Sequence, residues 1–324
     1  MMIILAIILT ACQPPPQTMI SAVQDTGTIS VFFCPSQPCE ESVLNVLQTA
    51  TRSIHCALYD LRLERIITLL NEKSRSLSVQ VVIDDENKKK LPLRPSFPLQ
   101  ADGSYGLMHN KFCIIDEKTV ITGSMNPTEN DAHKNNNNLI IIDSPVLAQN
   151  YEQEFQEMWN GTFKKGELVQ NPIIQLQATT LKNYFCPDDA CAEHVEEELR
   201  KAQRSIYFMT FSFTHKGIAN VLLLKHLNNV TVQGVMETTQ ISEYSVYPTL
   251  AYQLGTVRKD GNKRNMHHKV FIIDERTVVT GSFNPTKGGD ERNDENVLIM
   301  TDPVIARKFL DEFQLVWKEA QVND

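Results

Sequence analysis

The sequence contains no long apolar run and no excess of positive charge. Its longest aliphatic run, residues 3–9, is far too short to cross a bilayer. The 31 Lys and Arg residues are outnumbered by 39 Asp and Glu residues, and the net charge of −8 argues against broad electrostatic adhesion to nucleic acid or to an anionic membrane. A locally basic cleft is still compatible with this charge. The 324 residues leave room for two water-soluble domains that bury their own cores without a metal or a cofactor.

The aliphatic run belongs to a leader that reads MMIILAIILTACQPPPQ. Residues 9–12, Leu-Thr-Ala-Cys, resemble the lipobox of bacterial lipoproteins, and this resemblance implies that Cys12 becomes a lipidated N-terminus. Because the usual Lys/Arg segment is missing, plain secretion and a wrongly assigned start codon are the alternatives. In each case we expect residues 1–25 to lie outside the fold, since the Pro/Gln-rich piece cannot build a core. The sequence therefore predicts an exported protein, membrane-anchored as a lipoprotein or secreted or periplasmic.

Four of the seven cysteines form two pairs with the same spacing: Cys34 with Cys39, and Cys186 with Cys191. An exported protein meets oxidising conditions, so we expect two local disulfides rather than free thiols or a metal site made from all four thiolates. Cys56 and Cys113 lie inside apolar, strand-like runs. We expect these two to be buried as small hydrophobic residues.

The chain is an internal duplication. When residue 33 is laid on residue 185, Phe-Cys-Pro and Arg-Ser-Ile both match at an offset of 152. When residue 109 is laid on residue 267, a longer stretch matches at an offset of 158. Two constant offsets indicate a repeat, and the second copy must hold six extra residues between 206 and 267. We expect the extra residues to form a surface loop.

Each copy alternates strand-like and helix-like patterns and closes with a helix that starts at a capping residue followed by proline, Ser144-Pro145 or Asp302-Pro303. The expected fold class is α/β, with two tandem, pseudo-twofold-related α/β sandwich domains that each contain a mixed β-sheet flanked by helices. We place the first domain at 26–160, a linker at 161–180 and the second domain at 181–320.

Each copy carries a histidine and a lysine two residues apart, an aspartate five residues beyond the lysine, and a Gly-Ser-x-Asn segment farther on. In the first copy these are His109, Lys111, Asp116, Gly123, Ser124 and Asn126, and in the second copy His267, Lys269, Asp274, Gly281, Ser282 and Asn284. Side chains two apart on a strand point to the same face. Imidazole, ammonium, hydroxyl and amide groups would therefore gather on one face, as an anionic phosphoryl group requires.

These motifs resemble the signature of the phospholipase D superfamily, HxKxxxxD followed by GSxN, which normally occurs twice in an active site. The superfamily includes phospholipases D, cardiolipin hydrolases and endonucleases. The match has the same spacing in both copies and spans nearly the whole folded chain. The resemblance implies that both motifs meet at one cleft of a phosphoric diester hydrolase with no metal and no cofactor. We expect a monomer, because one chain holds both motifs.

Two histidines that face one phosphate suit double displacement. One neutral imidazole attacks phosphorus to form a phosphohistidine, while the other, protonated, donates to the leaving alkoxide and later activates water. The two lysines and the two motif asparagines would hold the non-bridging oxygens as negative charge builds. The two motif serines would orient their neighbours rather than attack.

One difference between the copies bears on the roles of the histidines. Glu295 follows His267 by 28 residues, and the same count from His109 gives Asn137. A carboxylate that hydrogen-bonds a catalytic imidazole raises its pKa, so we expect Glu295 to act on His267 and make it the general acid. His109, facing an amide, would then be the nucleophile, as the family tendency for the first motif also implies. Asp131 is another acid that could replace the carboxylate that is missing where Asn137 stands.

Two aspartates and one further histidine are expected to lie outside the chemistry. Asp116 and Asp274 stand an odd number of residues beyond the lysines, which turns them to the opposite face. We expect them to be structural and to accept hydrogen bonds from the turn that follows. His268, between the motif histidine and lysine, should also point away from the cleft as a surface or packed residue.

The motif reads only a phosphodiester, so the substrate stays open. The first hypothesis is hydrolysis of phospholipid head groups, because a lipid anchor would hold the enzyme at its substrate and the basic, apolar loop 88–99 could meet phosphate and acyl chains. The alternative is an endonuclease for DNA or RNA, because the basic segments 87–95 and 258–264 fit a nucleic-acid backbone equally well. A third hypothesis, a non-catalytic phosphate-binding pseudoenzyme, is disfavoured because all four histidine and lysine positions are filled.

Overall fold

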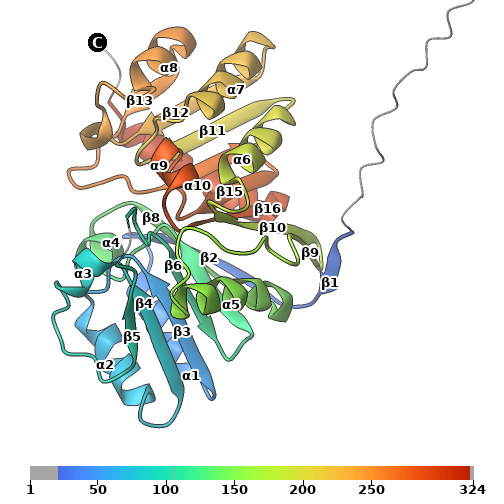
Figure 1. The fold of residues 1–324 in the computed structure, drawn as a ribbon. Helices are drawn as coiled ribbons and strands as arrows, with labels where there is room; N and C mark the ends of the chain where they lie inside the picture. The colour runs from blue at the N-terminus through green and yellow to red at the C-terminus, as the bar shows by residue number, and fades with distance from the viewer. Residues whose placement is uncertain (1–20, 104, 322–324) are drawn as a thin grey trace, which may run out of the picture.

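The computed structural model describes residues 21–103 and 105–321, which form two domains (Figure 1). The sheet of the first domain has the strand order β2 (Ile29–Cys34), β8 (Asn137–Asp143), β7 (Thr119–Gly123), β6 (Lys111–Ile115), β3 (Ser53–Leu58), β4 (Ser78–Ile83) and β5 (Leu99–Ala101). The sheet of the second domain has the order β1 (Val23–Asp25), β9 (Ile173–Leu176), β10 (Thr179–Cys186), β16 (Glu295–Thr301), β15 (Thr277–Gly281), β14 (Lys269–Ile273), β11 (Ser205–Thr210), β12 (Thr231–Met236) and β13 (Val257–Lys259). Both sheets are mixed, since β3, β4 and β5, like β11, β12 and β13, run parallel while the other pairs of the repeat are antiparallel. The predicted fold class is confirmed.

Helices cover both faces of each sheet. In the first domain α1 (Cys39–Thr49) and α2 (Glu64–Lys73) lie on one face and α5 (Pro145–Trp159) on the other. In the second domain α6 (Cys191–Arg200), α7 (Lys216–Leu227) and α8 (Tyr247–Leu254) lie on one face and α10 (Pro303–Glu319) on the other. The short helices are α3 (Asp85–Lys88), α4 (Glu129–His133), η1 (Thr238–Gln240) and α9 (Lys287–Glu291). The predicted caps also form, because Ser144 accepts a hydrogen bond from Leu147 N–H and Asp302 accepts from Val304 N–H.

Strand alternation assigns side chains to the two faces. In β6, Phe112 and Ile114 join the core beneath α5, whereas Cys113 and Ile115 join the core beneath α1 and α2. The core beneath α5 continues into the second domain. The two domains therefore share one hydrophobic core on this side.

The closing helix of each domain also reaches the sheet of the other. The Phe309 ring of α10 packs edge-on against Phe33 of β2, with ring centroids 5.1 Å apart. At the pseudo-twofold equivalent position, Tyr151 of α5 packs against Phe185 of β10 at 5.0 Å. Burial of these large aromatic rings fixes the relative position of the two domains.

A buried cluster of amides crosses the same interface. The side chain of Asn296 is fully buried; its amide N–H donates to Asn110 Oδ1 of the first domain at 2.8 Å, and its carbonyl accepts from Tyr151 O–H at 3.3 Å. Asn138, the counterpart in the first domain, donates to His268 Nδ1 at 3.3 Å. Buried polar groups are costly unless they are paired, so this cluster favours one relative orientation of the domains.

Two expected boundaries differ from the observed ones. Residues 21–25 were expected outside the fold, but β1 pairs in parallel with β9 and so adds an edge strand to the second sheet. The expected linker 161–180 contains β9 and the start of β10, because Gln175 and Thr180 lie opposite each other in these paired strands. The linker proper is therefore shorter than expected. The segment that precedes the first sheet in the chain is hydrogen-bonded to the second sheet through β1.

The extra residues of the second copy form more than a surface loop. The offset between the copies is 153 at β12 and 158 at β13, so most of the insertion lies between these strands. It contributes α8, whose residues Tyr247, Leu250 and Leu254 are buried against the domain. An amphipathic helical turn buried on one face explains why this insertion is ordered.

Three disulfides occur in the described residues. The predicted bridges Cys34–Cys39 and Cys186–Cys191 are both present. Cys56 and Cys113, expected as separate hydrophobic residues, also form a disulfide. The reason is register: β3 and β6 are antiparallel and place these two residues directly opposite each other. The equivalent residues of the second domain are Phe208 and Phe271, which pack against each other instead.

Substitution of Asn296 by alanine should lower the free energy of unfolding by about 3 kcal/mol, because it removes the hydrogen bonds that the buried side chains of Asn110, Thr122 and Tyr151 make with this amide. Urea unfolding followed by circular dichroism measures this loss. The control is Asn45→Ala on the exposed face of α1, which should change stability by less than about 0.5 kcal/mol. Equal unfolding midpoints for the two variants would contradict the role given to the amide cluster.

Candidate active site

The histidine and lysine of both motifs are buried where the two domains meet. His109 and His267 are only 6% and 7% exposed, and Lys111 and Lys269 are each 3% exposed. The lysines are the first residues of β6 and β14, so the histidines precede the strands rather than lie on them. Each lysine folds back on its own motif: Lys111 Nζ donates to the carbonyl oxygen of His109 at 2.6 Å, and Lys269 Nζ donates to that of His267 at 2.9 Å. Imidazole and ammonium are therefore side by side, as expected.

The backbone of each motif histidine is bound to the opposite domain. The N–H of His109 donates to the carbonyl oxygen of Asp294 at 2.9 Å, and the N–H of His267 donates to that of Asn136 at 2.8 Å. Asp294 and Asn136 are the residues just before β16 and β8. The first residue of each of these strands, Glu295 or Asn137, therefore lies beside the motif histidine of the other domain.

The partners of the two imidazoles are consequently exchanged between the domains. Glu295 Oε2 lies 2.8 Å from His109 Nδ1, and Asn137 Oδ1 lies 2.9 Å from His267 Nδ1. The expected contact of Glu295 with His267 is therefore wrong. The prediction paired residues that are 28 positions apart within one copy, whereas the observed contacts form between the two copies. Asp131, the alternative carboxylate, lies near His267, with 3.6 Å between Asp131 Oδ2 and His267 Nδ1.

The hydrogen bonds fix the tautomer of both histidines. Asn137 donates its amide N–H to the carbonyl oxygen of Asp131 at 3.1 Å, which turns Asn137 Oδ1 toward His267. Because Asn137 Oδ1 and the Glu295 carboxylate are acceptors, both Nδ1 atoms carry the proton. Each imidazole in its neutral form then keeps a lone pair on Nε2. This is the form that a nucleophile or a general base requires.

Burial and the lysines favour the neutral histidines. Burial, together with the charges of Lys111 and Lys269, holds the pKa of His109 well below 6.5. Burial and Lys269 do the same to the pKa of His267, against the opposing effect of Asp131. Both imidazoles are therefore neutral at pH 7.

Glu295 and the two lysines are likewise shifted toward the uncharged form. Burial raises the pKa of Glu295 to about 7, although the charge of Lys111 opposes the shift. Burial lowers the pKa of Lys111 to about 8 and holds that of Lys269 well below 10.5, in the latter case with help from Lys111. Several strongly perturbed groups in one place are typical of catalytic sites.

An aromatic ring packs on each histidine–lysine pair, and the sequence-based reasoning missed both rings. Tyr59 lies edge-on to His109 at 4.8 Å, and its ring centroid is 5.1 Å from Lys111 Nζ. Phe211 occupies the same place beside His267, at 4.6 Å between ring centroids. The offset of 152 that relates Tyr59 to Phe211 was a usable signal, because both directly follow equivalent strands. The rings limit the freedom of the imidazoles and favour the nearby ammonium groups.

The Gly-Ser-x-Asn segments lie just past the ends of β7 and β15. Gly123 and Gly281 have φ values of 133° and 131°, which favour glycine, and a Cβ atom at Gly123 would stand 2.4 Å from the carbonyl oxygen of Asn138. Ser124 donates to Asn137 Oδ1 at 2.9 Å, and Ser282 donates to Glu295 Oε2 at 2.6 Å. The serines therefore orient the groups that hold the imidazoles, as expected.

The motif asparagines differ in their surroundings. Asn126 is buried and uses one amide N–H to donate to Asp131 Oδ2 at 2.7 Å, which leaves one N–H for an oxygen of a bound phosphate. Asn284 is half-buried. The Oδ1 atoms of both are buried without a hydrogen-bond partner among the described residues. These orphaned polar atoms mark the place where a polar ligand would complete the site.

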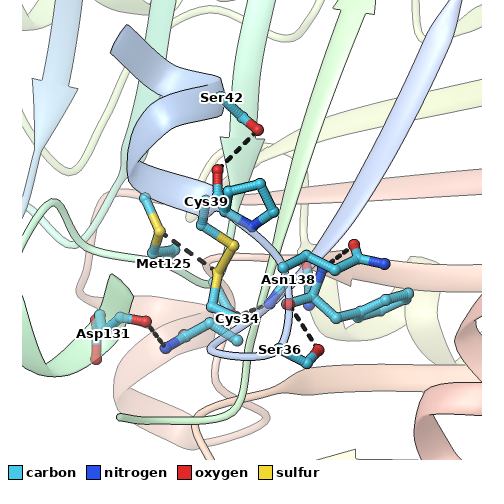
Figure 2. The surroundings of a disulfide bond; sticks show 12 residues. Cys34, Ser36, Cys39, Ser42, Met125, Asp131 and Asn138 are labelled. Atoms are coloured by element: carbon cyan, nitrogen blue, oxygen red, sulfur yellow. Dashed lines mark hydrogen bonds between the residues drawn. A yellow bond between two sulfur atoms is a disulfide. The ribbon is translucent and has the colours of Figure 1, made fainter. Parts of the chain in front are cut away.

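The Cys34–Cys39 bridge supports the first of these segments. Figure 2 shows the bridge beside Met125, whose sulfur lies 3.6 Å from Cys34 Sγ. Met125 stands between Ser124 and Asn126 in the chain, so a fixed cross-link packs directly against the segment that carries them. In the second domain the same chain position is Phe283, also buried.

Asp116 and Asp274 lie away from the site and hold the backbone. Asp116 accepts hydrogen bonds from the N–H groups of residues 51–53, and Asp274 accepts from those of residues 203–205. The donors come from the turns before β3 and β11 rather than from the following turn. Burial of Asp116 is slight, and these backbone donors lower its pKa to about 2. Both aspartates therefore have a structural role.

Several other predicted features lie elsewhere. His268 is fully buried and contacts Glu312 of α10 at 3.3 Å, so it is a packed histidine outside the site. In the loop 88–99 the apolar residues turn inward, since Phe97 is only 4% exposed, and the loop presents no large apolar surface for acyl chains. Cys12 lies outside the described residues. Within residues 21–103 and 105–321, no helix is long and apolar enough to cross a membrane, and no three potential metal-binding side chains stand together.

Two imidazoles with available Nε2 atoms, two ammonium groups and two amides arranged around one position define a phosphodiesterase-type active site. Comparison with known proteins agrees. The family model described as "Cardiolipin synthase, PLD-like domain" matches residues 43–159 and 195–317, once in each copy. The chain therefore belongs to the phospholipase D superfamily and is a hydrolase of the phospholipase D kind.

Individual relatives resemble one copy or the whole chain. Mitochondrial cardiolipin hydrolase of Xenopus laevis is 32% identical over 156 residues, which cover 45% of this chain and 71% of that protein. Phospholipase D of Rickettsia typhi is 29% identical over 142 residues, which cover 44% of this chain and 70% of that protein. The structure of phosphatidylserine synthase from Haemophilus influenzae matches 92% of this chain and 89% of its own, with a TM-score of 0.70 at 12% identity, which shows the shared fold.

Replacement of Glu295 by glutamine should lower kcat/KM by about 100- to 1,000-fold and change the pH profile. The wild-type profile should rise through a limb near pH 7, because Glu295, with its pKa raised to about 7, supports His109 only when ionised. It should fall above about pH 8 as Lys111 loses its proton. Glutamine has no titration, so the rising limb should disappear while the falling limb stays.

The matched control is Glu312→Gln, which removes another buried carboxyl that contacts a histidine but lies outside the site. This variant should keep both limbs. Hydrolysis of bis(p-nitrophenyl) phosphate, a soluble diester, provides the measurement. A rising limb near pH 7 in Glu295→Gln would show that another group controls the nucleophile.

Proposed function

We propose that this chain is a metal-independent phosphodiesterase that hydrolyses the head-group phosphodiester of phospholipids through a phosphohistidine at His109. The observation that supports the proposal most is the pair of imidazoles held at Nδ1, His109 by Glu295 and His267 by Asn137, beside two buried lysines. This set provides a nucleophile, an acid and a cationic cradle without further components.

In the first step, Nε2 of neutral His109 attacks phosphorus. The N–P bond forms while the bond from phosphorus to the leaving oxygen breaks, and protonated His267 gives its Nε2 proton to the leaving alkoxide. Positive charge grows on the His109 imidazole during the attack. The carboxylate of Glu295, 2.8 Å from Nδ1, stabilises that charge, and the two lysines stabilise the phosphoryl oxygens.

In the second step, neutral His267 takes a proton from water as the water oxygen attacks phosphorus. The N–P bond breaks and its electron pair returns to Nε2 of His109. The products are a phosphate monoester and the alcohol already released, and His267 is protonated again for the next turnover. The roles of the two histidines are thus distinct in each step.

The partners of the imidazoles support this assignment of roles. The attacking imidazole gains positive charge, so a carboxylate partner lowers its barrier, whereas the acid loses positive charge, so a neutral amide partner suits it. The proposed nucleophile is His109, as in the sequence-based prediction, but the reason differs. The sequence-based prediction paired Glu295 with His267 to make that histidine the acid, whereas here Glu295 stabilises the charge that grows on His109. Asp131, 3.6 Å from His267, helps that imidazole to take up a proton.

The choice of a phospholipid substrate is supported by the relatives. The two curated relatives described above are named cardiolipin hydrolase and phospholipase D, and the matching family model is described by cardiolipin synthase. All three names refer to lipids with phosphodiester head groups. We therefore propose a phospholipid rather than a nucleic acid as the substrate.

The proposal predicts activity in the presence of EDTA. Phosphatidylcholine, cardiolipin and single-stranded nucleic acid should be offered side by side, with release of head group or of shorter oligonucleotides as the measurement. Wild type should cleave a phospholipid in EDTA, and His109→Ala should be slower by at least about 1,000-fold. Loss of all activity in EDTA would exclude the mechanism, and cleavage of nucleic acid alone would exclude the substrate.

The assignment of the nucleophile predicts where a covalent intermediate accumulates. In His267→Asn the second step lacks its base, so bis(p-nitrophenyl) phosphate, whose leaving group needs no acid, should leave a phosphoryl adduct on His109. Peptide mass spectrometry locates the adduct. The double variant His267→Asn with His109→Ala should show none. An adduct on residue 267 of the single variant His109→Asn would reverse the assignment.

A further inference from the structure

We propose that the second domain carries a docking face for an anionic phospholipid bilayer, formed by Leu223, Leu224 and Leu227 of α7, Tyr244, and Tyr252 of α8. The inference rests on the proposed function in taking a lipid as the substrate, and it adds the surface by which the folded domain reaches that substrate. The face lies on two neighbouring helices of the second domain (Figure 1).

The duplication provides an internal comparison for α7. At the offset of 152, two polar residues of α2 and one just beyond its end correspond to three leucines of α7: Asn71 to Leu223, Glu72 to Leu224, and Arg75 to Leu227. Leu224 is 56% exposed and Leu227 is 75% exposed, so these two add little to the core of their own domain. The surface of α7 is therefore apolar where the equivalent surface of the first copy is polar. Such an exposed apolar surface is typical of one that meets an apolar partner.

Two exposed tyrosines extend the apolar surface. Tyr244 is 74% exposed and precedes α8, and Tyr252 is 86% exposed on α8 itself. Thr249 and Tyr252 are three residues apart on α8 and so share one side of the helix. Thr249 and Leu223 line the same cavity, which makes the surface continuous between α7 and α8. Tyrosine, with an apolar ring and a polar tip, suits the boundary between acyl chains and head groups.

That cavity adjoins the segment that follows the motif asparagine of the second copy. It has a volume of about 840 Å³ and is lined by Leu223 and Tyr244 of the face and by Thr286. The N–H of Thr286 donates to the carbonyl oxygen of Asn284 at 2.6 Å, so one wall of the cavity begins two residues beyond the motif asparagine. A phospholipid drawn from a bilayer on this face would therefore enter next to the phosphate-binding groups.

The residues that line the cavity also differ in charge from their counterparts in the first copy. Lys216, Lys287 and Arg292 line the cavity together with one acidic residue, Glu243. In the first copy, glutamates stand at the positions of two of these cations: Glu64 corresponds to Lys216, and Glu129 corresponds to Lys287. Cations beside exposed apolar side chains are the combination that binds an anionic lipid surface.

The leucines favour a bilayer over nucleic acid. Nucleic acid is bound by cationic side chains along its backbone and by aromatic rings stacked on its bases. Aliphatic side chains at Leu223, Leu224 and Leu227 contribute to neither, whereas each gains free energy when it enters the acyl boundary of a membrane.

The test measures binding to vesicles by co-sedimentation. The full chain carries Cys12→Ser to prevent lipidation and His109→Ala to prevent turnover, and the vesicles are phosphatidylcholine with a minor fraction of phosphatidylglycerol. The change Leu224→Glu with Leu227→Arg, which installs the residues found at the equivalent positions 72 and 75 of the first copy, should weaken partitioning by about tenfold or more. The control Leu168→Glu with Leu315→Arg alters two leucines that are similarly exposed on other elements, and it should bind as the parent does.

Independent readouts separate this inference from the proposed function. With His109 restored, the Leu224→Glu, Leu227→Arg variant should hydrolyse bis(p-nitrophenyl) phosphate at the wild-type rate, which also shows that it folds. Unchanged vesicle binding by this variant overturns the docking face even if the soluble diester is cleaved. The inference is also overturned if the variant loses binding to a single-stranded oligonucleotide instead, or if sedimentation velocity shows that it dissociates a dimer of the parent.

Discussion

The active site depends on the exchange of backbone hydrogen bonds between the two domains. His109 N–H binds the carbonyl oxygen of Asp294, and His267 N–H binds that of Asn136. These two bonds set the histidines beside the first residues of the opposite last strands. The shared core beneath α5 and α10 and the buried amides of the interface keep the bonds in place. Because neither domain can complete its own histidine, the duplication makes one site rather than two.

Within this nearly symmetric frame, a few substitutions make the halves unequal. Where one imidazole contacts Glu295, the other contacts Asn137, and the proposed difference in role between the two histidines rests on this single difference. Elsewhere the same position is filled in different ways, as where the Cys56–Cys113 disulfide of one domain corresponds to two packed phenylalanines of the other. Positions in the core stay apolar, whereas positions at the site and on α7 change charge or polarity. Function, rather than stability, accounts for the second kind of change.

The sequence was sufficient to predict the fold class, the duplication, the motif residues that meet at the site and two disulfides, because each of these follows from local patterns or repeated spacing. It missed Tyr59 and Phe211, which pack on the histidines. The sequence was not sufficient where residues far apart in the chain come into contact, because neither local periodicity nor the repeat spacing indicates such contacts. Glu295 was assigned to His267 because both belong to one copy, and only the interface shows that His109 is its partner. The Cys56–Cys113 bridge likewise depends on the register of β3 with β6, and β1 pairs with a strand of the other domain. Long-range register is set by packing across the whole molecule, and local periodicity does not record it.

The electrostatics of the site link substrate binding to catalysis. Burial favours the uncharged forms of His109, His267, Lys111, Lys269 and Glu295. A phosphodiester brings one negative charge into this dry environment, where it favours the ammonium forms of the lysines and the protonated form of His267. Glu295 is close enough to His109 to stabilise the charge that the attack creates. In the proposed mechanism, the general acid His267 would therefore become protonated when the substrate binds, which would let two chemically identical side chains act as nucleophile and acid in the same buried pocket.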